Sequence, residues 1–399
     1  MNFSLLKHEF RSIVNSKKNI IFIIFLVAII ALYSFELLPK SQTIFTFDPV
    51  KIEEELKSKE FMQESRRANG YTGVNAITGQ YYYAADESWI NFYRKLLYSY
   101  KTDNFPRFLD LRLYDPSSFL DSEMYKGKSR FPIKDYTHLT NKVLLTYQGY
   151  LEDNFTISKS LVEEKTAIQT LFHLLLTPFT YFIVIIGIYL SCDMLVKDRQ
   201  SRTVMQGLPV SWYQVVNTKT LVAFLYSTFI TFALLILGVI FISISQGFGY
   251  WNMRIPIMIG QLGASFEDYE YMNVSTFFLI SAGFICLLIY LFTRINMLFS
   301  LIFKNEWLVL IISTVILFSE QIYFNREARK LFGIDIHLFP QTYFDFGKVI
   351  NGDKNFLLNL NTISFEQGFI ILIFTILALE VLIFIVSRIF NKIYFYKFA

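Results

Sequence analysis

The stretch from Lys197 to Lys219, KDRQSRTVMQGLPVSWYQVVNTK, governs how the whole chain is interpreted. It is polar and basic, it contains a turn, and it separates two long apolar runs. Each run is long enough to cross a bilayer, because about 20 helical residues span a hydrocarbon core of roughly 30 Å. A short loop between two such runs lies at one face of the membrane, and its positive charge indicates the cytoplasmic face.

The composition is typical of a membrane protein. Of the 399 residues, 53% are hydrophobic and only 18% are charged, against roughly 25% charged residues in soluble domains. The net charge of +4 is too small to indicate a nucleic-acid partner. Cys192 and Cys286, the two cysteines, both fall in apolar runs. The water-facing parts therefore hold neither a disulfide framework nor a CxxC metal site.

The apolar runs predict an all-α polytopic membrane protein with six transmembrane helices and an α+β extracellular domain between helices 1 and 2. Lysine and arginine gather in the short inner segments, which places both termini in the cytoplasm. Arg326, Arg329 and Lys330 fit less well, because they fall on the proposed outer side. The predicted segments are an amphipathic interfacial helix (1–19), the six spans (20–38, 169–196, 220–245, 274–293, 307–323 and 368–388), the extracellular domain (39–168), a cytoplasmic loop (197–219), two outer loops (246–273 and 324–367), an inner loop (294–306) and a cytoplasmic tail (389–399).

Two segments carry further expectations. Residues 1–19 show apolar positions at helical spacing among lysines, which predicts a helix lying in the membrane interface; a basic flank that orients the first span is a compatible alternative. Pro178 is expected to kink the second span. In the extracellular domain we expect helices over 52–67 and 89–100 and a short strand around Tyr81–Tyr83. Its aromatic residues are either a ligand surface or ordinary core packing.

No catalytic or metal site is predicted. The chain contains no GxxxxGK[ST], HExxH or GxSxG motif, so it cannot cradle nucleotide phosphates through a known loop. The four histidines are scattered over different segments and are interpreted as packing or interface residues, namely His8, His138, His173 and His337.

Three acidic residues inside predicted spans are candidates for a pathway or gate, because a charge buried in lipid is costly. Glu380 lies near the middle of the last span, whereas Glu36 and Glu320 lie near outer ends, where water is close. All three are candidates for lining one outward-facing path. The alternative for Glu380 is a packing role, satisfied by a neighbouring hydroxyl.

The loop itself predicts a stiff cytoplasmic projection. Asp198, Arg199 and Arg202 form a charged cluster that is followed by Thr203, and Leu208 and Pro209 make a corner. Ser211 is a suitable N-cap for a helix expected to end at Lys219. An ordinary loop with inner positive charge is the alternative.

These residues resemble the coupling loop of permease subunits of ABC-2 type exporters. The resemblance is carried by Asp198-Arg199, Ser201, Thr203, Leu208-Pro209-Val210-Ser211 and Lys219, and by the outer segment Phe339-Pro340-Gln341-Thr342-Tyr343-Phe344. Gln200 and Arg202 depart from the family pattern. The insertion after the first span is similar to the family branch with a large extracellular domain.

The resemblance implies a half-transporter in a bacterial cell membrane. The loop would contact a separate ABC ATP-binding protein, which binds ATP and Mg; this chain would hold no cofactor of its own. A second permease copy or a paralogue would complete the pathway, and the substrate would be a peptide, an amphiphile or an ion. The main alternative is an antimicrobial-peptide sensing or immunity module with the extracellular domain as receptor. A membrane enzyme is a third possibility, which no motif favours.

Overall fold

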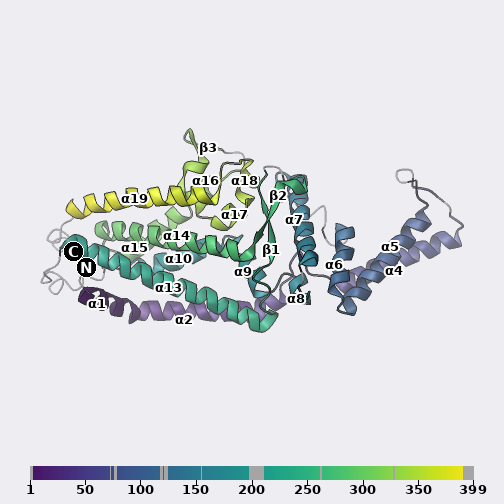
Figure 1. The fold of residues 1–399 in the computed structure, drawn as a ribbon, viewed down its shortest axis with the longest axis horizontal. Coiled ribbons are helices and arrows are strands. Elements are labelled where there is room, and N and C mark those ends of the chain that lie inside the picture. The colour runs from purple at the N-terminus through teal and green to yellow at the C-terminus, as the bar shows by residue number, and fades with distance from the viewer. Residues whose placement is uncertain are drawn as a thin grey trace.

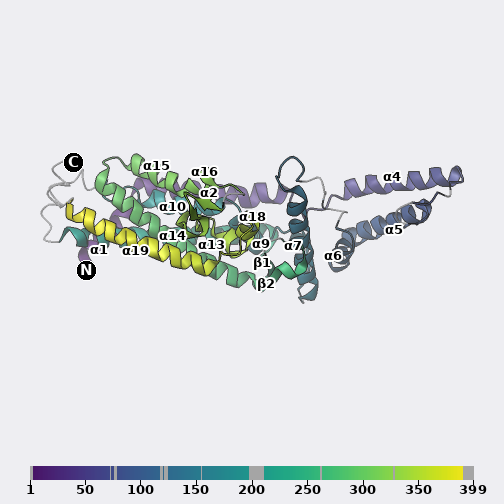
Figure 2. The same ribbon diagram turned by 90° about the horizontal axis from the view of Figure 1, so that it is seen from above.

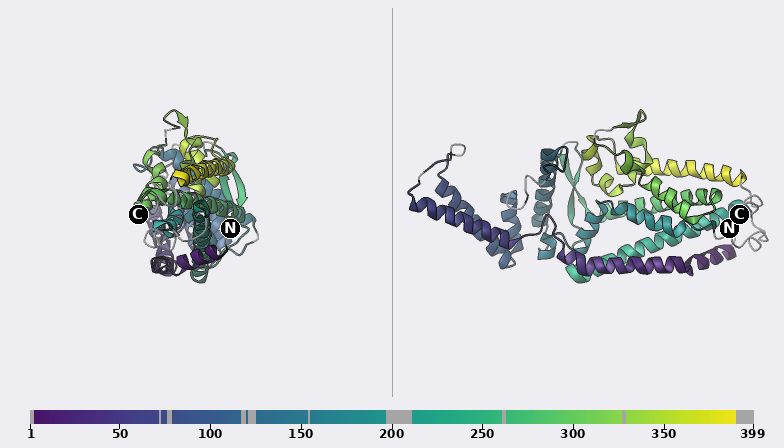
Figure 3. Two further views of the ribbon diagram at one scale, coloured as in Figure 1. Left: turned by 90° about the vertical axis from the view of Figure 1, so that its left-hand side faces the viewer. Right: turned by 180° about the vertical axis from the view of Figure 1, so that it is seen from behind.

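The computed structural model is an elongated molecule, of which residues 3–71, 73–75, 79–116, 120, 125–153, 155–196, 211–260, 263–326 and 329–389 are described. Long helices lie side by side in a bundle at one end, a helix stands across the end of that bundle, and a helical hairpin projects beyond it (Figures 1 and 3).

Four helices in the described part of the chain are long and apolar enough to cross a membrane. Two shorter helices, bent by 79° at a break, together make a fifth crossing if they count as one span. The four long elements are α2 (Lys17–Leu32, prolonged to Lys40 by the π-turn Tyr33–Leu37 and by α3, Leu38–Lys40), α13 (Trp212–Gln246), α14 (Val274–Ile302) and α19 (Phe365–Ile389). In the bent pair, α9 (Ala167–Leu175) is the last helix before the break and α10 (Phe179–Ser191) is the helix after it.

The bend between α9 and α10 agrees with the predicted kink but is much sharper. Pro178 is the N-cap of α10, and its missing N–H together with its ring prevents one helix from continuing through it. The next predicted span, 307–323, is also interrupted. It consists of α15 (Glu306–Leu317), about 18 Å long at 1.5 Å per residue, and α16 (Ser319–Tyr323).

The ends of several elements gather at one end of the bundle, which we call the terminal end (Figures 1 and 2). α1 (Phe3–Val14) lies there with the start of α2, the end of α10, the start of α13 and the end of α19. The opposite end, which carries the crossing helix and the hairpin, we call the far end.

The helix α14 extends into the predicted inner loop. It continues to Ile302 rather than ending near residue 293. Arg294 and Asn296 suggested a polar loop, but both are buried and hydrogen-bonded inside the bundle. Because these polar side chains have partners there, they do not interrupt the helix.

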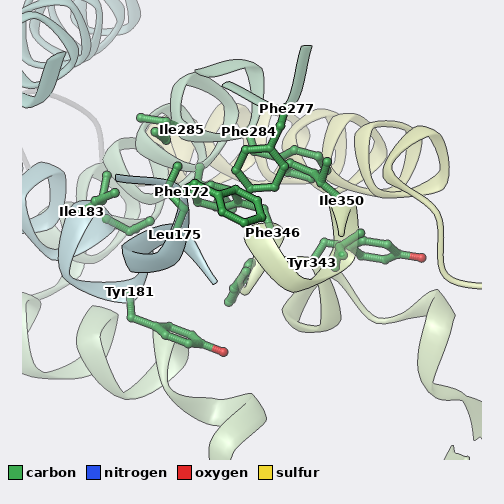
Figure 4. Close-up of a cluster of buried hydrophobic side chains, with 14 of the residues drawn as sticks. Phe172, Leu175, Tyr181, Ile183, Phe277, Phe284, Ile285, Tyr343, Phe346 and Ile350 are labelled. Atoms are coloured by element: carbon green, nitrogen blue, oxygen red, sulfur yellow. The ribbon is translucent and has the colours of Figure 1, made fainter. Parts of the chain in front are cut away.

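The predicted outer loop 324–367 folds back into the bundle instead of covering its surface. Its rings Tyr343 and Phe346 are fully buried. Phe346 stacks against Phe284 of α14, and Phe172 of α9 and Phe277 of α14 belong to the same cluster (Figure 4). This segment comprises β3 (Lys330–Leu331), β4 (Ile334–Asp335), the 3-10 turns Ile336–Leu338 and Pro340–Tyr343, α17 (Phe346–Ile350) and α18 (Asp353–Leu358).

Gly347 permits the closest approach in this segment. A Cβ atom at this position would lie 1.8 Å from the backbone oxygen of Leu175 in α9. Only glycine leaves room for such backbone-to-backbone contact.

The inserted region 39–168 is helical, and the expectation of a strand there is wrong. Its elements are α4 (Pro49–Ala68), α5 (Tyr82–Lys101), α6 (Phe105–Tyr114), α7 (Pro132–Glu152) and α8 (Lys159–Val162). Among its described residues the only β pairing is one isolated bridge between Val74 and Tyr81. α4 and α5 form the projecting hairpin, and α7 is the helix that stands across the bundle (Figure 2).

The strand predicted around Tyr81–Tyr83 is the start of α5. The Arg66 guanidinium of α4 lies over the Tyr82 ring and pairs with Asp86 one turn later. These contacts between helices override the β-propensity of the tyrosines, which depends strongly on context. Strands occur elsewhere: β1 (Arg254–Met258) pairs antiparallel with β2 (Tyr269–Asn273), with Ile255 opposite Met272.

The aromatic residues of the inserted region form a core in one place and are exposed in another. Around Arg112, which is buried and donates hydrogen bonds to the Phe45 carbonyl and the Tyr147 hydroxyl at 2.9 Å each, the rings form a core. Tyr81 and Tyr83, by contrast, are exposed near the tip of the hairpin.

Candidate coupling site and buried ion pairs

The structure describes the two flanks of the predicted coupling loop. Ser211 and Lys219 are among the described residues. The remaining predicted coupling residues lie outside them, namely Asp198, Arg199, Arg202, Thr203, Leu208 and Pro209.

Ion pairs fix the segment that enters the loop, at the end of α10. Asp193, which follows α10, is almost fully buried. The Lys18 amine at the start of α2 lies 3.5 Å from an Asp193 oxygen and 3.6 Å from a Glu306 oxygen at the start of α15. It also lies 3.2 Å from the Cys192 sulfur. The chain entering the loop is therefore tied to two other helices. The sequence offered a weak signal, since each charge sits at the end of an apolar run.

The outgoing flank begins with the predicted cap. The Ser211 hydroxyl oxygen accepts a hydrogen bond from the Gln214 N–H at 3.4 Å, which confirms Ser211 as an N-cap. The helix does not end at Lys219, however. It continues without a break to Gln246, because the apolar run beyond Lys219 favours the same helix.

Lys219 faces the interior of the protein. Its amine lies 2.6 Å from the Glu9 carboxylate of α1, and both side chains are more than nine-tenths buried. A side chain in this position cannot reach a separate protein directly. Its place favours a positioning role, in which α1 and the start of α13 are held together.

Glu380 is paired with a base that was predicted to lie in a loop. The Arg294 Nε atom is 2.5 Å from the Glu380 carboxylate, and the Tyr290 hydroxyl donates to the same oxygen at 2.7 Å. Arg294 also donates to Asn217 at 3.0 Å and to Thr220 at 3.2 Å. This network, which we call the arginine node, joins α13, α14 and α19. Figure 1 shows the course of these three helices. Charges in a membrane interior are normally paired in this way.

The other two acids have different partners. Glu320 is fully buried, lies 2.5 Å from the Lys354 amine of α18, and accepts a hydrogen bond from the Tyr181 hydroxyl at 2.9 Å. Glu36 is exposed and pairs with Lys40 one turn along its own helix. The structure does not bring the three acids into one cluster.

Two of the three basic residues that fitted poorly on the predicted outer side have local acids. Arg326 forms two hydrogen bonds with Asp135 of α7, at 2.7 and 2.9 Å, and Lys330 lies 3.7 Å from Asp335. Because Asp135 neutralises the Arg326 charge, the presence of Arg326 is weak evidence that this segment faces the cytoplasm. Across the part of the chain that the structure describes, no three His, Cys, Asp or Glu side chains converge as a metal site would require.

A second buried cluster joins the crossing helix to the segment that folds back. His138 of α7 lies 2.6 Å from the Tyr269 hydroxyl and 3.3 Å from the Asp353 carboxylate of α18. Burial lowers the pKa of His138 below its usual value. Burial opposes ionisation of Asp353 too, but the adjacent Lys142 and His138 hold the pKa of its carboxyl well below the usual range.

Comparison with known proteins places these features in a family context. A family model described as ABC-2 family transporter protein matches residues 3–326. That range contains α1, both flanks of the loop, and Arg294 of the arginine node. Neither the curated proteins nor the solved structures contain a match to this chain.

Proposed function

The chain belongs to the ABC-2 family of transporter proteins, and we propose that it is the membrane-spanning permease subunit of an ATP-driven exporter. A member of this family is a transport component that works with a separate ATP-binding subunit at the membrane. The observation that carries the proposal is the pair of buried ionic contacts that anchor both flanks of the loop at the terminal end.

The proposed mechanism transmits force from this loop into the spans. The ATP-binding subunit binds ATP and Mg, and its closure pushes on residues 198–211. Movement of the loop passes through Asp193 and Lys18 to α2 and α15, and through Lys219 and Glu9 to α13 and α1. Packed helices joined by such contacts move as rigid elements, which a flexible linker cannot do.

The proposed topology keeps six crossings with the terminal end in the cytoplasm. α15 and α16 together form the short fifth crossing, and the hairpin of α4 and α5 lies outside. Exposed basic residues at the terminal end, Lys7, Arg11 and Lys17, support this orientation. A chain freed of Cys192 and Cys286 tests it: a membrane-impermeant thiol reagent should label Phe61→Cys in intact cells and His8→Cys only after lysis. The reverse pattern would overturn the orientation.

The substrate is proposed to be a peptide, an amphiphile or an ion that leaves the cell. The alternative role in antimicrobial-peptide immunity is favoured by one feature of the hairpin. Arg66, Arg67, Tyr71, Tyr81 and Tyr83 line a depression of about 400 Å³ near its tip. Arginines beside exposed tyrosines suit recognition of a peptide.

The function is tested by reconstitution with the ATP-binding subunit and a second permease chain. In lipid nanodiscs, the complex should hydrolyse ATP faster than the ATP-binding subunit alone. Absence of both a stable complex and any change in hydrolysis would refute the permease assignment.

A further inference from the structure

A well-formed pocket lies at the far end of the bundle, away from the loop. It encloses about 460 Å³, within the range of roughly 300–1,000 Å³ found for small-molecule sites. Four parts of the chain bound it: residues 41–45 that follow α3, one face of α7, the length of α9, and β1. Tyr33 and Leu38, from the last turns of the first candidate span, also line it. The pocket therefore borders the end of that candidate span.

The walls of the pocket are mostly apolar. Leu139 and Val143 of α7, Phe172 of α9, and Met253 and Ile255 beside or within β1 all contribute to them. None of these side chains offers a hydrogen bond, so the walls suit a hydrocarbon chain rather than a polar solute.

One end of the pocket is polar and is built around Glu164. This carboxylate is almost fully buried, accepts a hydrogen bond from the Tyr150 hydroxyl at 3.1 Å, and contacts the His173 imidazole. Gln169 donates to the same Tyr150 hydroxyl at 2.8 Å and so orients it. Glu164 also has a φ of 55°, a left-handed conformation that a residue with a side chain rarely adopts. Such backbone strain is often held at binding sites.

The charge at this end is acidic. Lys142 also lines the pocket, but its amine lies 2.8 Å from Asp353. The neighbouring Glu163 does not line the pocket and pairs with Lys165 at 2.8 Å. Among the described residues, the Glu164 carboxylate is contacted by the Tyr150 hydroxyl and the His173 imidazole but by no lysine or arginine. A bound cationic group would therefore share this carboxylate with the His173 imidazole.

We propose that this pocket binds an amphiphile with a single hydrocarbon chain and a protonated amine head. The chain fills the apolar walls, and the amine lies against Glu164. Entry is from the membrane interface, because Tyr33 and Leu38 at the end of the first span line the pocket. The inference goes beyond the proposed function and relies on it only for calling this end the outer one. Binding requires neither ATP nor the loop, so the binding assay and the coupling assays can fail separately.

The test uses the full chain in phosphatidylcholine nanodiscs and a twelve-carbon alkylamine that carries a photoreactive diazirine near the end of its chain. Labelling, mapped by mass spectrometry, is expected in α7 and α9 around Leu139 and Phe172. Dodecylamine should compete at concentrations at least tenfold lower than dodecanol or dodecanoate. Equal competition by the three compounds, or labelling confined to lipid-exposed faces of the spans, would overturn the proposal.

Two variants separate charge from packing. Glu164→Gln keeps the hydrogen-bond acceptor for Tyr150, and we expect it to weaken competition by dodecylamine at least tenfold, whereas the matched control Glu163→Gln should leave it unchanged. Leu139→Trp fills the pocket, keeps Glu164, and should abolish labelling of α9. Melting temperatures of all three variants establish that they are folded. Equal effects of the two glutamate variants, or undiminished labelling in a folded Leu139→Trp protein, would refute the site.

Discussion

Replacement of Glu380 by glutamine is expected to destabilise the helix bundle, whereas the same change at Glu36 is not. Glu380 lies 2.5 Å from Arg294, which is itself almost fully buried between α13, α14 and α19. The variant leaves the arginine charge in place and removes the carboxylate that balances it. Glu36 pairs with Lys40 on an exposed surface of its own helix, where water already solvates both groups.

The size of the effect follows from burial. Loss of one partner from a fully buried ion pair costs about 3–5 kcal/mol. The Glu380 side chain is 24% exposed, and glutamine still accepts the hydrogen bond from Tyr290, so we expect about 2 kcal/mol. An exposed pair one helical turn apart contributes only about 0.3–0.5 kcal/mol. In a chain of this length the larger change lowers the melting temperature by roughly 2–4 °C.

The chain supplies its own probe for this measurement. Cys192 is 1% exposed, so a thiol-reactive fluorogenic dye reports its exposure on heating, and Cys286→Ala removes the second thiol. The double variant Arg294→Met with Glu380→Met should recover stability relative to Glu380→Gln, because it leaves no unpaired charge. A melting temperature lowered equally by Glu36→Gln and Glu380→Gln, or no recovery in the double variant, would contradict the role of the arginine node.

Three further perturbations test other contacts. Lys219→Met should lower the melting temperature, and adding Glu9→Gln should lower it little more, because the two form one buried pair; additive shifts would contradict this. His138 has a lowered pKa, so its stabilising contribution is complete above the usual pKa of about 6.5 and is lost as the pH falls through it. Between pH 7.5 and 5.5 the melting temperature should therefore fall less in His138→Gln than in the exposed control His8→Gln. An equal fall in the two variants would refute this contribution of His138. Gly347→Ala should destabilise the bundle by about 3 kcal/mol, because its Cβ would meet an α9 carbonyl at 1.8 Å; unchanged melting would contradict that close packing.

The long spans were predictable because the bilayer allows few solutions. A continuous apolar run must hydrogen-bond its own backbone in lipid, which makes a helix the expected structure. α2, α13 and α19 follow this rule closely. The position of the bend in the second span was also indicated by Pro178, although its angle was not.

The polar contacts were beyond prediction because they join residues far apart in the chain. Arg294 looked like the end of a span, since nothing in its neighbourhood indicates that Glu380 balances its charge. Lys219 looked available to a partner for the same reason, because Glu9 lies in another helix. A charge pattern along the sequence gives the side of the membrane, but not which charges are buried together.

Local propensity misled at two places for different reasons. Three consecutive tyrosines favour a strand, but contacts between α4 and α5 stabilise a helix at Tyr82. The segment 324–367 contains glycine, proline and asparagine, which indicate a surface loop. Its burial depends on the packing of Phe346 against Phe284 of α14 and of Tyr343 against Gly368 of α19, which only the assembled fold reveals.

Coupling through the loop is tested by ATP hydrolysis in the reconstituted complex that carries Leu208→Gly and Pro209→Gly together. Both positions lie outside the described residues, and both changes remove stiffness without altering charge. The variant should insert into membranes in normal amounts, bind dodecylamine as the unmodified chain does, and lose most of the permease-dependent change in ATP hydrolysis. Hydrolysis that depends on the permease as strongly in this variant as in the unmodified chain would contradict the coupling role of the loop.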